Sequence, residues 1–237
     1  MQRHAIATAL GLTALAAALP AHAEASDAQA LRLMHECKAA TGGAALDQPE
    51  AFRETGTITQ DGQSSTYVTY VDLHALRSET ERMVGSRPLR GGFDRTSSWR
   101  VSAAGQVQRQ TGAAAVRGDL LGAWLTVSGY LYLERFPTTY RYLGRRSAAA
   151  GLYDLVEASP ANADSIQLWL DARTHRLAHV DAISEGEHLT GDLGDYREIA
   201  GTWVAYSLDI TQADQKISLR LASLTYIPLA DAPIAPP

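Results

Sequence analysis

The stretch that decides the fold is IQLWLDARTHRLAHVDAI, residues 166–183. Asp171, His175 and His179 are each four residues apart. On a helix this spacing would place a carboxylate and two imidazoles on one face, as a candidate metal site. Residues 166–171, however, alternate between apolar and other side chains with the two-residue period of a β-strand. The same residues therefore allow two interpretations, a helical metal site and a β-hairpin.

The strand interpretation separates the candidate ligands. Asp171 would end one strand, His175 would open the next, and His179 would lie about 13 Å beyond His175 at ~3.3 Å per residue. A metal site needs three or four ligands that converge on one ion, and His188 lies farther along the chain still. We therefore predict a hairpin turning at 171–175, with no metal site and no other cofactor.

The N-terminus has the features of a cleavable signal peptide. A short basic region containing Arg3 precedes the apolar run AIATALGLTALAAALP, and AHA at 21–23 has the small residues of a cleavage site. The apolar run is short for a membrane span. We expect residues 1–23 to be removed, the mature chain to be exported to the periplasm, and no membrane-spanning segment to follow the cleavage.

Charge and cysteine content narrow the possible partners. The chain has 21 Lys and Arg against 26 Asp and Glu, a formal net charge of −5, which disfavours nucleic acid and anionic membrane surfaces as partners. Cys37 is the single cysteine, so an internal disulfide is excluded. Its position in an apolar helical pattern predicts a buried, unreactive side chain.

The mature sequence predicts one domain of mixed composition. A helix over residues 28–41, capped by Ser26 or Asp27, should end at the glycine pair 42–43. A hairpin around Asp61–Gly62 and further strands at roughly ten-residue spacing predict an antiparallel meander that either curls or closes. The alternation of apolar residues changes phase near Ala222–Ser223, which predicts a β-bulge. We expect a single domain over 24–228 and a Pro/Ala-rich tail over 229–237.

Residues 112–133, GAAAVRGDLLGAWLTVSGYLYL, interrupt the strands with a helical apolar period. The second half is apolar nearly all round, so this helix should be largely covered. It has two possible roles: it belongs to the core, or it lines an apolar cavity.

Catalytic signatures are incomplete. HECKA at 35–39 begins like a zinc-protease helix but has Ala39 where the second histidine is required. TVSGY at 126–130 lacks the first glycine of a nucleophile elbow. We therefore expect a protein that is not an enzyme.

In the order of its predicted elements and in the residue patterns of several short segments, the chain resembles the periplasmic outer-membrane lipoprotein-sorting proteins, the Lol carrier family. The resemblance covers most of the mature chain and rests on these segments: ATGGAAL (40–46), RETGTIT (53–59), GGFDRTSSWRV (91–101), RFPTTYRYLGRR (135–146), YDLVEASP (153–160) and IQLWLDARTHRLAHV (166–180).

The resemblance implies an α+β fold, in which a strongly curved antiparallel sheet forms an unclosed half-barrel with helices covering its concave face. It also implies an apolar cavity between sheet and helices that holds acyl chains without cofactor or chemistry. The residues expected to line it are Leu120, Leu121, Trp124, Leu125, Val127, Tyr130, Leu131 and Phe136. That these side chains simply fill the concave face is an open alternative.

Two functions follow as expectations. The first is a non-catalytic periplasmic carrier of a lipid or of lipoprotein acyl chains. The second is a protein-interaction or sensor module of the same fold without a lipid ligand. The family's carriers have an arginine that ties a lid helix to the sheet. Arg53, early in the first predicted strand, is a candidate position for it, but the sequence assigns no counterpart.

Overall fold

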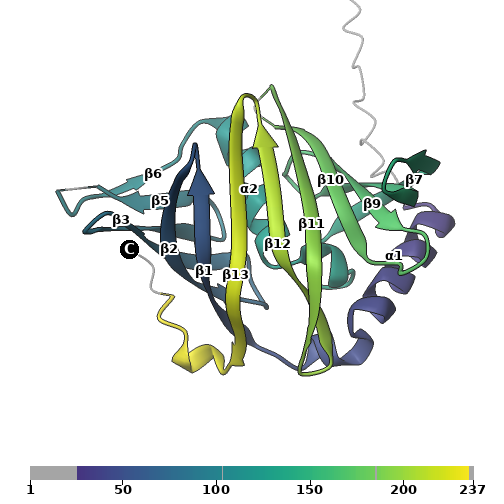
Figure 1. Cartoon of the computed structure of the whole chain (residues 1–237), viewed down its shortest axis with the longest axis horizontal. Helices are drawn as coiled ribbons and strands as arrows, with labels where there is room; N and C mark the ends of the chain where they lie inside the picture. The colour runs from purple at the N-terminus through teal and green to yellow at the C-terminus, as the bar shows by residue number, and fades with distance from the viewer. Residues whose placement is uncertain (1–25, 103, 185, 235–237) are drawn as a thin grey trace, which may run out of the picture.

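A computed structural model describes residues 26–102, 104–184 and 186–234 (Figure 1). The predicted signal peptide, 1–23, lies outside the described residues. Within these ranges the chain forms one antiparallel sheet of thirteen strands and two α-helices. The strands are β1 (Ala51–Gln60), β2 (Gln63–Asp72), β3 (Arg77–Val84), β4 (Arg87–Asp94), β5 (Ser98–Val101), β6 (Val107–Arg109), β7 (Thr138–Ala148), β8 (Gly151–Pro160), β9 (Ile166–Asp171), β10 (Leu177–Ser184), β11 (Glu187–Ile199), β12 (Thr202–Gln212) and β13 (Gln215–Ile227).

The sheet consists of two meanders joined in the middle. Strands β1 to β6 follow one another in space, as do β7 to β13, and β1 pairs with β13 to unite the two sets. The first and last strands in the spatial order are β6 and β7, which do not pair with each other. The curved sheet is therefore unclosed, and the predicted α+β half-barrel fold is confirmed.

The connection from β6 to β7 must pass from one edge of the sheet to the other. It contains helix α2 (Ala113–Thr126) and the 3₁₀ turn η2 (Gly129–Leu131). Figure 1 shows α2 behind β12 and β13, crossing the sheet on its inner side. The predicted cover over the concave face is thus a consequence of where the two free edges lie.

The second helix ends earlier than the sequence predicted. Its apolar period continues to residue 133, but α2 stops at Thr126, and Ser128 adopts a left-handed conformation with φ 52°. Beyond this turn Gly129 lies so close to the indole of Trp124 that a Cβ would be 2.3 Å from Cδ1. Apolar periodicity reports burial, and η2 is as buried as a helix would be, so the pattern did not reveal the turn.

Helix α1 (Ala28–Thr41) is anchored to the edge strand β7 through the two residues before it. The Asp27 carboxylate accepts a hydrogen bond from Ala30 N–H at 2.6 Å, the predicted N-cap, and another from Tyr142 N–H on β7 at 2.6 Å. Ser26 Oγ accepts from Tyr140 N–H at 2.9 Å. Side chains thus satisfy part of an edge that would otherwise be open to pairing. Cys37, on the inner face of α1, is fully buried as predicted.

The predicted hairpins are confirmed. Asp61 and Gly62, between β1 and β2, both have positive φ, as the predicted turn requires. Asp171 ends β9 and accepts hydrogen bonds from the backbone N–H groups of Arg173 and Thr174, at 3.0 and 2.6 Å. His175 does not open the returning strand as expected; it lies in the turn with φ 57°, and β10 begins two residues later at Leu177.

The candidate metal ligands have separate partners. His175 Nδ1 lies 3.5 Å from a Glu36 carboxylate oxygen, whereas His179 Nδ1 lies 2.7 Å from Asp192. In the part of the chain that is described, no three His, Cys, Asp or Glu side chains gather as a metal site would require. In the same part, no helix is long and apolar enough to cross a membrane.

The close contact between Gly129 and Trp124 predicts a large effect of one methyl group. Gly129→Ala should lower the free energy of unfolding by about 1–3 kcal/mol because the indole must move in a packed core. Gly122→Ala, on the preceding helix α2, is the matched control, since its added methyl meets no atom within 4 Å. That variant should be about 0.5–1 kcal/mol more stable than the wild type. Equal urea midpoints for the two variants would contradict this packing.

The Asp27 anchor predicts a pH-dependent loss of stability. The hydrogen bonds from Ala30 and Tyr142 lower the pKa of the Asp27 carboxyl. Its stabilising effect should therefore be complete above the ordinary aspartate value of about 4 and disappear as the pH falls through the lowered value. Asp27→Asn keeps one acceptor oxygen but loses the one that faces Tyr142. Its urea midpoint should be below that of the wild type at pH 7, and the gap should close at low pH.

Asp214→Asn, a change of the same kind in the exposed turn between β12 and β13, is the control for Asp27→Asn. It should leave the midpoint unchanged across the pH range. A gap of constant size for Asp27→Asn would show that its carboxylate charge has no part in the anchor.

Candidate ligand cavity

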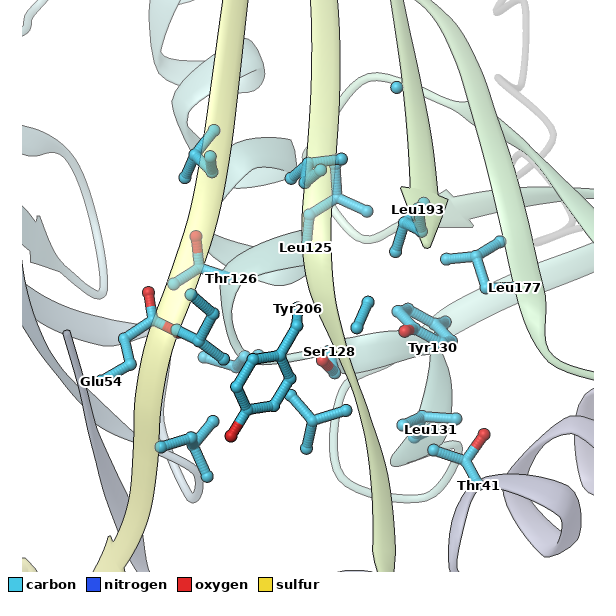
Figure 2. Close-up of a pocket in the computed structure, with 18 of the residues that line it drawn as sticks. Thr41, Glu54, Leu125, Thr126, Ser128, Tyr130, Leu131, Leu177, Leu193 and Tyr206 are labelled. Carbon is cyan, nitrogen blue, oxygen red and sulfur yellow. The ribbon is translucent and has the colours of Figure 1, made fainter. Parts of the chain in front are cut away.

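A cavity of about 460 Å³ lies between the sheet and the α2–η2 segment (Figure 2). This volume falls in the range of roughly 300–1,000 Å³ that is typical of small-molecule sites. The sheet contributes side chains from β1, β2 and β10 to β13, and the cover contributes side chains from residues 122–132. Thr41 at the end of α1 and Leu46 in the following 3₁₀ turn η1 (Gly43–Asp47) complete the wall.

The wall is mainly apolar because β10 to β13 place aliphatic and aromatic side chains on their inner side. Strand β12 contributes the most lining residues, and four of them alternate along the strand and therefore share one of its sides. These are Val204, Tyr206, Leu208 and Ile210. Leu208 stands directly opposite Leu193 on β11 and Leu219 on β13, so the apolar surface continues across three strands.

The structure places some of the eight predicted lining residues on the cavity wall and the others away from it. Four are on its wall: Leu125, Val127, Tyr130 and Leu131. The other four lie elsewhere: Leu121, Trp124 and Phe136 are buried in the hydrophobic core, and Leu120 is half-buried away from the cavity. Trp124 is 1% exposed and makes an edge-to-face contact with Tyr130, so it supports the wall from behind.

Most of the wall was missed by the sequence prediction, because it belongs to the sheet. The alternation of apolar residues in β12 and β13 identified which residues share a face. It did not say which face is concave, since that depends on how the whole sheet curves. The predicted lining residues were instead taken from α2 and the segment after it, because this apolar run interrupts a strand-rich sequence.

One carboxyl group lies in this apolar setting. Glu54, on β1, lines the cavity and stands opposite Leu224 of β13. Figure 2 shows its side chain among the lining residues of the cavity. Burial, which disfavours the charged form, raises the pKa of Glu54 to about 7, and a hydrogen bond with the Tyr67 hydroxyl partly opposes that rise.

The contact between Glu54 and Tyr67 depends on a glycine. Gly56 stands directly opposite Tyr67 across the β1–β2 ladder, and a Cβ on Gly56 would lie 2.8 Å from the ring and 2.9 Å from the hydroxyl. Without a side chain at 56, the Tyr67 ring lies across β1 and its hydroxyl reaches the Glu54 carboxyl diagonally. Glycine at this position therefore places a phenol and a carboxyl together at one end of the cavity.

The predicted bulge in β13 lies beside this pair. Thr55 pairs with Ser223 and Gly56 pairs with Leu221, so Ala222 is the extra residue on the bulged strand. The prediction of a bulge near Ala222–Ser223 is confirmed. Because the bulge changes the phase of β13, Leu219 and Leu221 before it and Leu224 and Tyr226 after it all line the cavity.

Arg176, in the turn before β10, ties the end of α1 to the sheet. Its Nε donates to the carbonyl oxygen of Ala40 at 3.2 Å, and its guanidinium lies over the Trp203 ring at 3.9 Å. Arg53, the candidate from the sequence, lies 6.0 Å from the Tyr70 ring instead. No local sequence pattern identified Arg176, because its partners lie in distant segments of the chain.

The described part of the wall is suited to binding apolar groups. Its hydroxyl groups belong to tyrosines and to Thr41, Thr126, Ser128 and Ser207. No His, Lys, Arg or Cys of the described chain stands on the wall. The wall therefore offers Ser128 no histidine or lysine of the kind that activates a serine nucleophile.

Solved structures share this architecture. A putative outer-membrane lipoprotein-sorting protein domain from Vibrio parahaemolyticus aligns with a TM-score of 0.59 at 15% identity, covering 86% of this chain and 95% of that one. A LolA-superfamily protein from Nitrosomonas europaea aligns at 0.61 and 13% identity, covering 87% and 97%. A DUF1329 family protein from Desulfovibrio piger aligns at 0.56 and 11% identity, covering 83% and 92%.

No family model and no curated protein matches the sequence. At these levels of sequence identity, structural similarity shows a shared fold. That fold agrees with the one implied by the sequence resemblance. The chain has the fold of the LolA-like lipoprotein-sorting proteins.

Proposed function

We propose that this chain is a non-catalytic periplasmic protein that binds the acyl chain of a lipid or of an acylated lipoprotein in the cavity beneath α2. The observation that carries the proposal is the apolar wall of the cavity, built by β10 to β13 on one side and by residues 122–132 on the other. The fold it shares with lipoprotein-sorting and LolA-superfamily proteins supports it.

The driving force for such binding is the removal of apolar surface from water. Each Å² of acyl chain that leaves water contributes roughly 25 cal/mol, so a long chain gains several kcal/mol by filling the cavity. The wall gains as well, because apolar side chains such as Leu193, Leu208 and Leu219 would exchange solvent for packed neighbours. A flexible chain suits this site because the wall is continuous across strands and has few polar groups to fix one geometry.

A periplasmic location is the second part of the proposal. It rests on the signal-peptide features of residues 1–23. A carrier in this compartment would shield acyl chains from water between membranes. The alternative function, an interaction or sensor module without a lipid, predicts that the cavity remains without lipid in the native protein.

Substitutions at Leu125 and Leu120 separate binding from stability. Both residues lie half-buried on α2, but Leu125 is on the cavity wall and Leu120 is not. Leu125→Gln should weaken the binding of N-dodecyl dansylamide, an uncharged fluorescent probe, about fivefold, because roughly 1 kcal/mol of apolar contact is lost. Leu120→Gln should bind the probe like the wild type. Titration of probe fluorescence measures both, and equal losses would place the probe outside the cavity.

The native ligand can be identified by purifying the protein together with what it has bound. We expect the mature protein, isolated from its own host without detergent, to carry about one acylated molecule per chain in native mass spectrometry. Extraction and lipid analysis should identify the acyl group. A protein that is free of lipid and does not bind the dansyl probe would instead support the interaction module.

A further inference from the structure

We propose that Glu54 and Tyr67 form a head-group subsite at one end of the cavity, and that this subsite selects amphiphiles with a cationic, hydrogen-bond-donating group over those with a carboxylate. The inference rests on the proposed function, because it concerns the polar end of a ligand whose chain fills the same cavity. It assigns this chain a preference among acyl-chain ligands that the fold by itself does not supply.

The first support is the position of the carboxyl group. Of the described residues on the wall, Glu54 is the one with an acidic side chain, and none carries a positive charge that would neutralise it. Its cross-strand neighbour on β13 is the apolar Leu224. The strongest electrostatic partner available to this carboxylate is therefore a bound cation, and in an apolar site such a pair is stronger than in water.

The second support is the arrangement that holds the group in place. Tyr67 crosses Gly56 to reach Glu54, and a Cβ at Gly56 would meet both the tyrosine ring and the backbone oxygen of Arg220, at 2.8 and 2.5 Å. The phenol lies beside the carboxyl as its hydrogen-bond partner. A ligand carboxylate at the same place would put two like charges together unless one of them took up a proton.

The titratable groups around Glu54 determine how binding should vary with pH. Tyr67 faces it from β2, Tyr226 lies on β13, Tyr206 on β12, and Tyr130 and Tyr132 follow α2. Burial raises the pKa of Tyr67, Tyr130, Tyr132 and Tyr226 above the ordinary value of 10. Within the described wall, Glu54 is thus the group expected to change charge near neutral pH, since its pKa is about 7.

The test compares three ligands that have the same alkyl chain. Dodecylamine, dodecanol and dodecanoate are each titrated against protein that is loaded with N-dodecyl dansylamide, at pH 8.5. The wild type should bind dodecylamine about tenfold or more tightly than dodecanol, the gain typical of a hydrogen bond to a charged group. Dodecanoate should bind more weakly than dodecanol. In Glu54→Gln the advantage of the amine should disappear while dodecanol binds as before.

Glu134→Gln is the matched control, since it removes the same charge from an exposed position that is not on the cavity wall. It should keep the wild-type order of affinities. Melting temperatures of all variants show whether each is folded.

The pH dependence gives an independent readout. A primary amine stays protonated below about pH 10, so the affinity for dodecylamine should rise as Glu54 loses its proton between about pH 6 and pH 8. Tyr67→Phe removes the hydrogen bond that lowers the pKa of Glu54. This variant should move the midpoint of the rise to higher pH.

Two failures have different meanings. If the three ligands bind in the same order to wild type and to Glu54→Gln, or if amine binding does not change with pH, the head-group subsite is wrong and the acyl-chain cavity stands. If neither the dansyl probe nor any of the three ligands binds, the proposed function itself fails.

Discussion

The pairing of β1 with β13 is the constraint on which the rest of the structure depends. These strands are separated by most of the chain, yet their ladder joins two meanders into one sheet and leaves β6 and β7 as its opposite edges. The connection from β6 to β7 must then cross the sheet, and its apolar residues pack against the concave side. The cavity and its cover both follow from that one antiparallel pairing.

The same ladder contains the features that give the cavity its polar end. The bulge at Ala222 changes the phase of β13, so apolar residues on both sides of it face the interior. Beside it, Gly56 leaves room for Tyr67 to cross β1 and meet Glu54. A buried carboxyl costs free energy unless something compensates it. Its position on an apolar wall whose described residues include no cation is the reason to connect it with a ligand rather than with folding.

The elements that a local pattern defines were predictable from the sequence. The cap at Asp27 and the turn at Asp61–Gly62 were placed from residue types with strong conformational preferences. The hairpin at 166–183 followed from a two-residue period, which took precedence over the tempting four-residue spacing of its histidines. The end of α2 was placed too late, because Val127 and Leu131 continue the apolar pattern while the backbone turns at Ser128 and Gly129. Four of the eight expected lining residues are on the wall for the same reason: the pattern measures burial, and core and cavity wall are both buried.

The sequence by itself determined the strand and helix periods, the turns, the bulge and the overall α+β character, because each depends on residues close together in the chain. Only the tertiary structure decided which face of the sheet is concave, that the cavity wall comes mainly from β10 to β13, and that Arg176 holds the end of α1. It also brought Glu54 and Tyr67 together across Gly56. These features depend on contacts between distant segments and on the curvature of the whole sheet, neither of which a local pattern encodes.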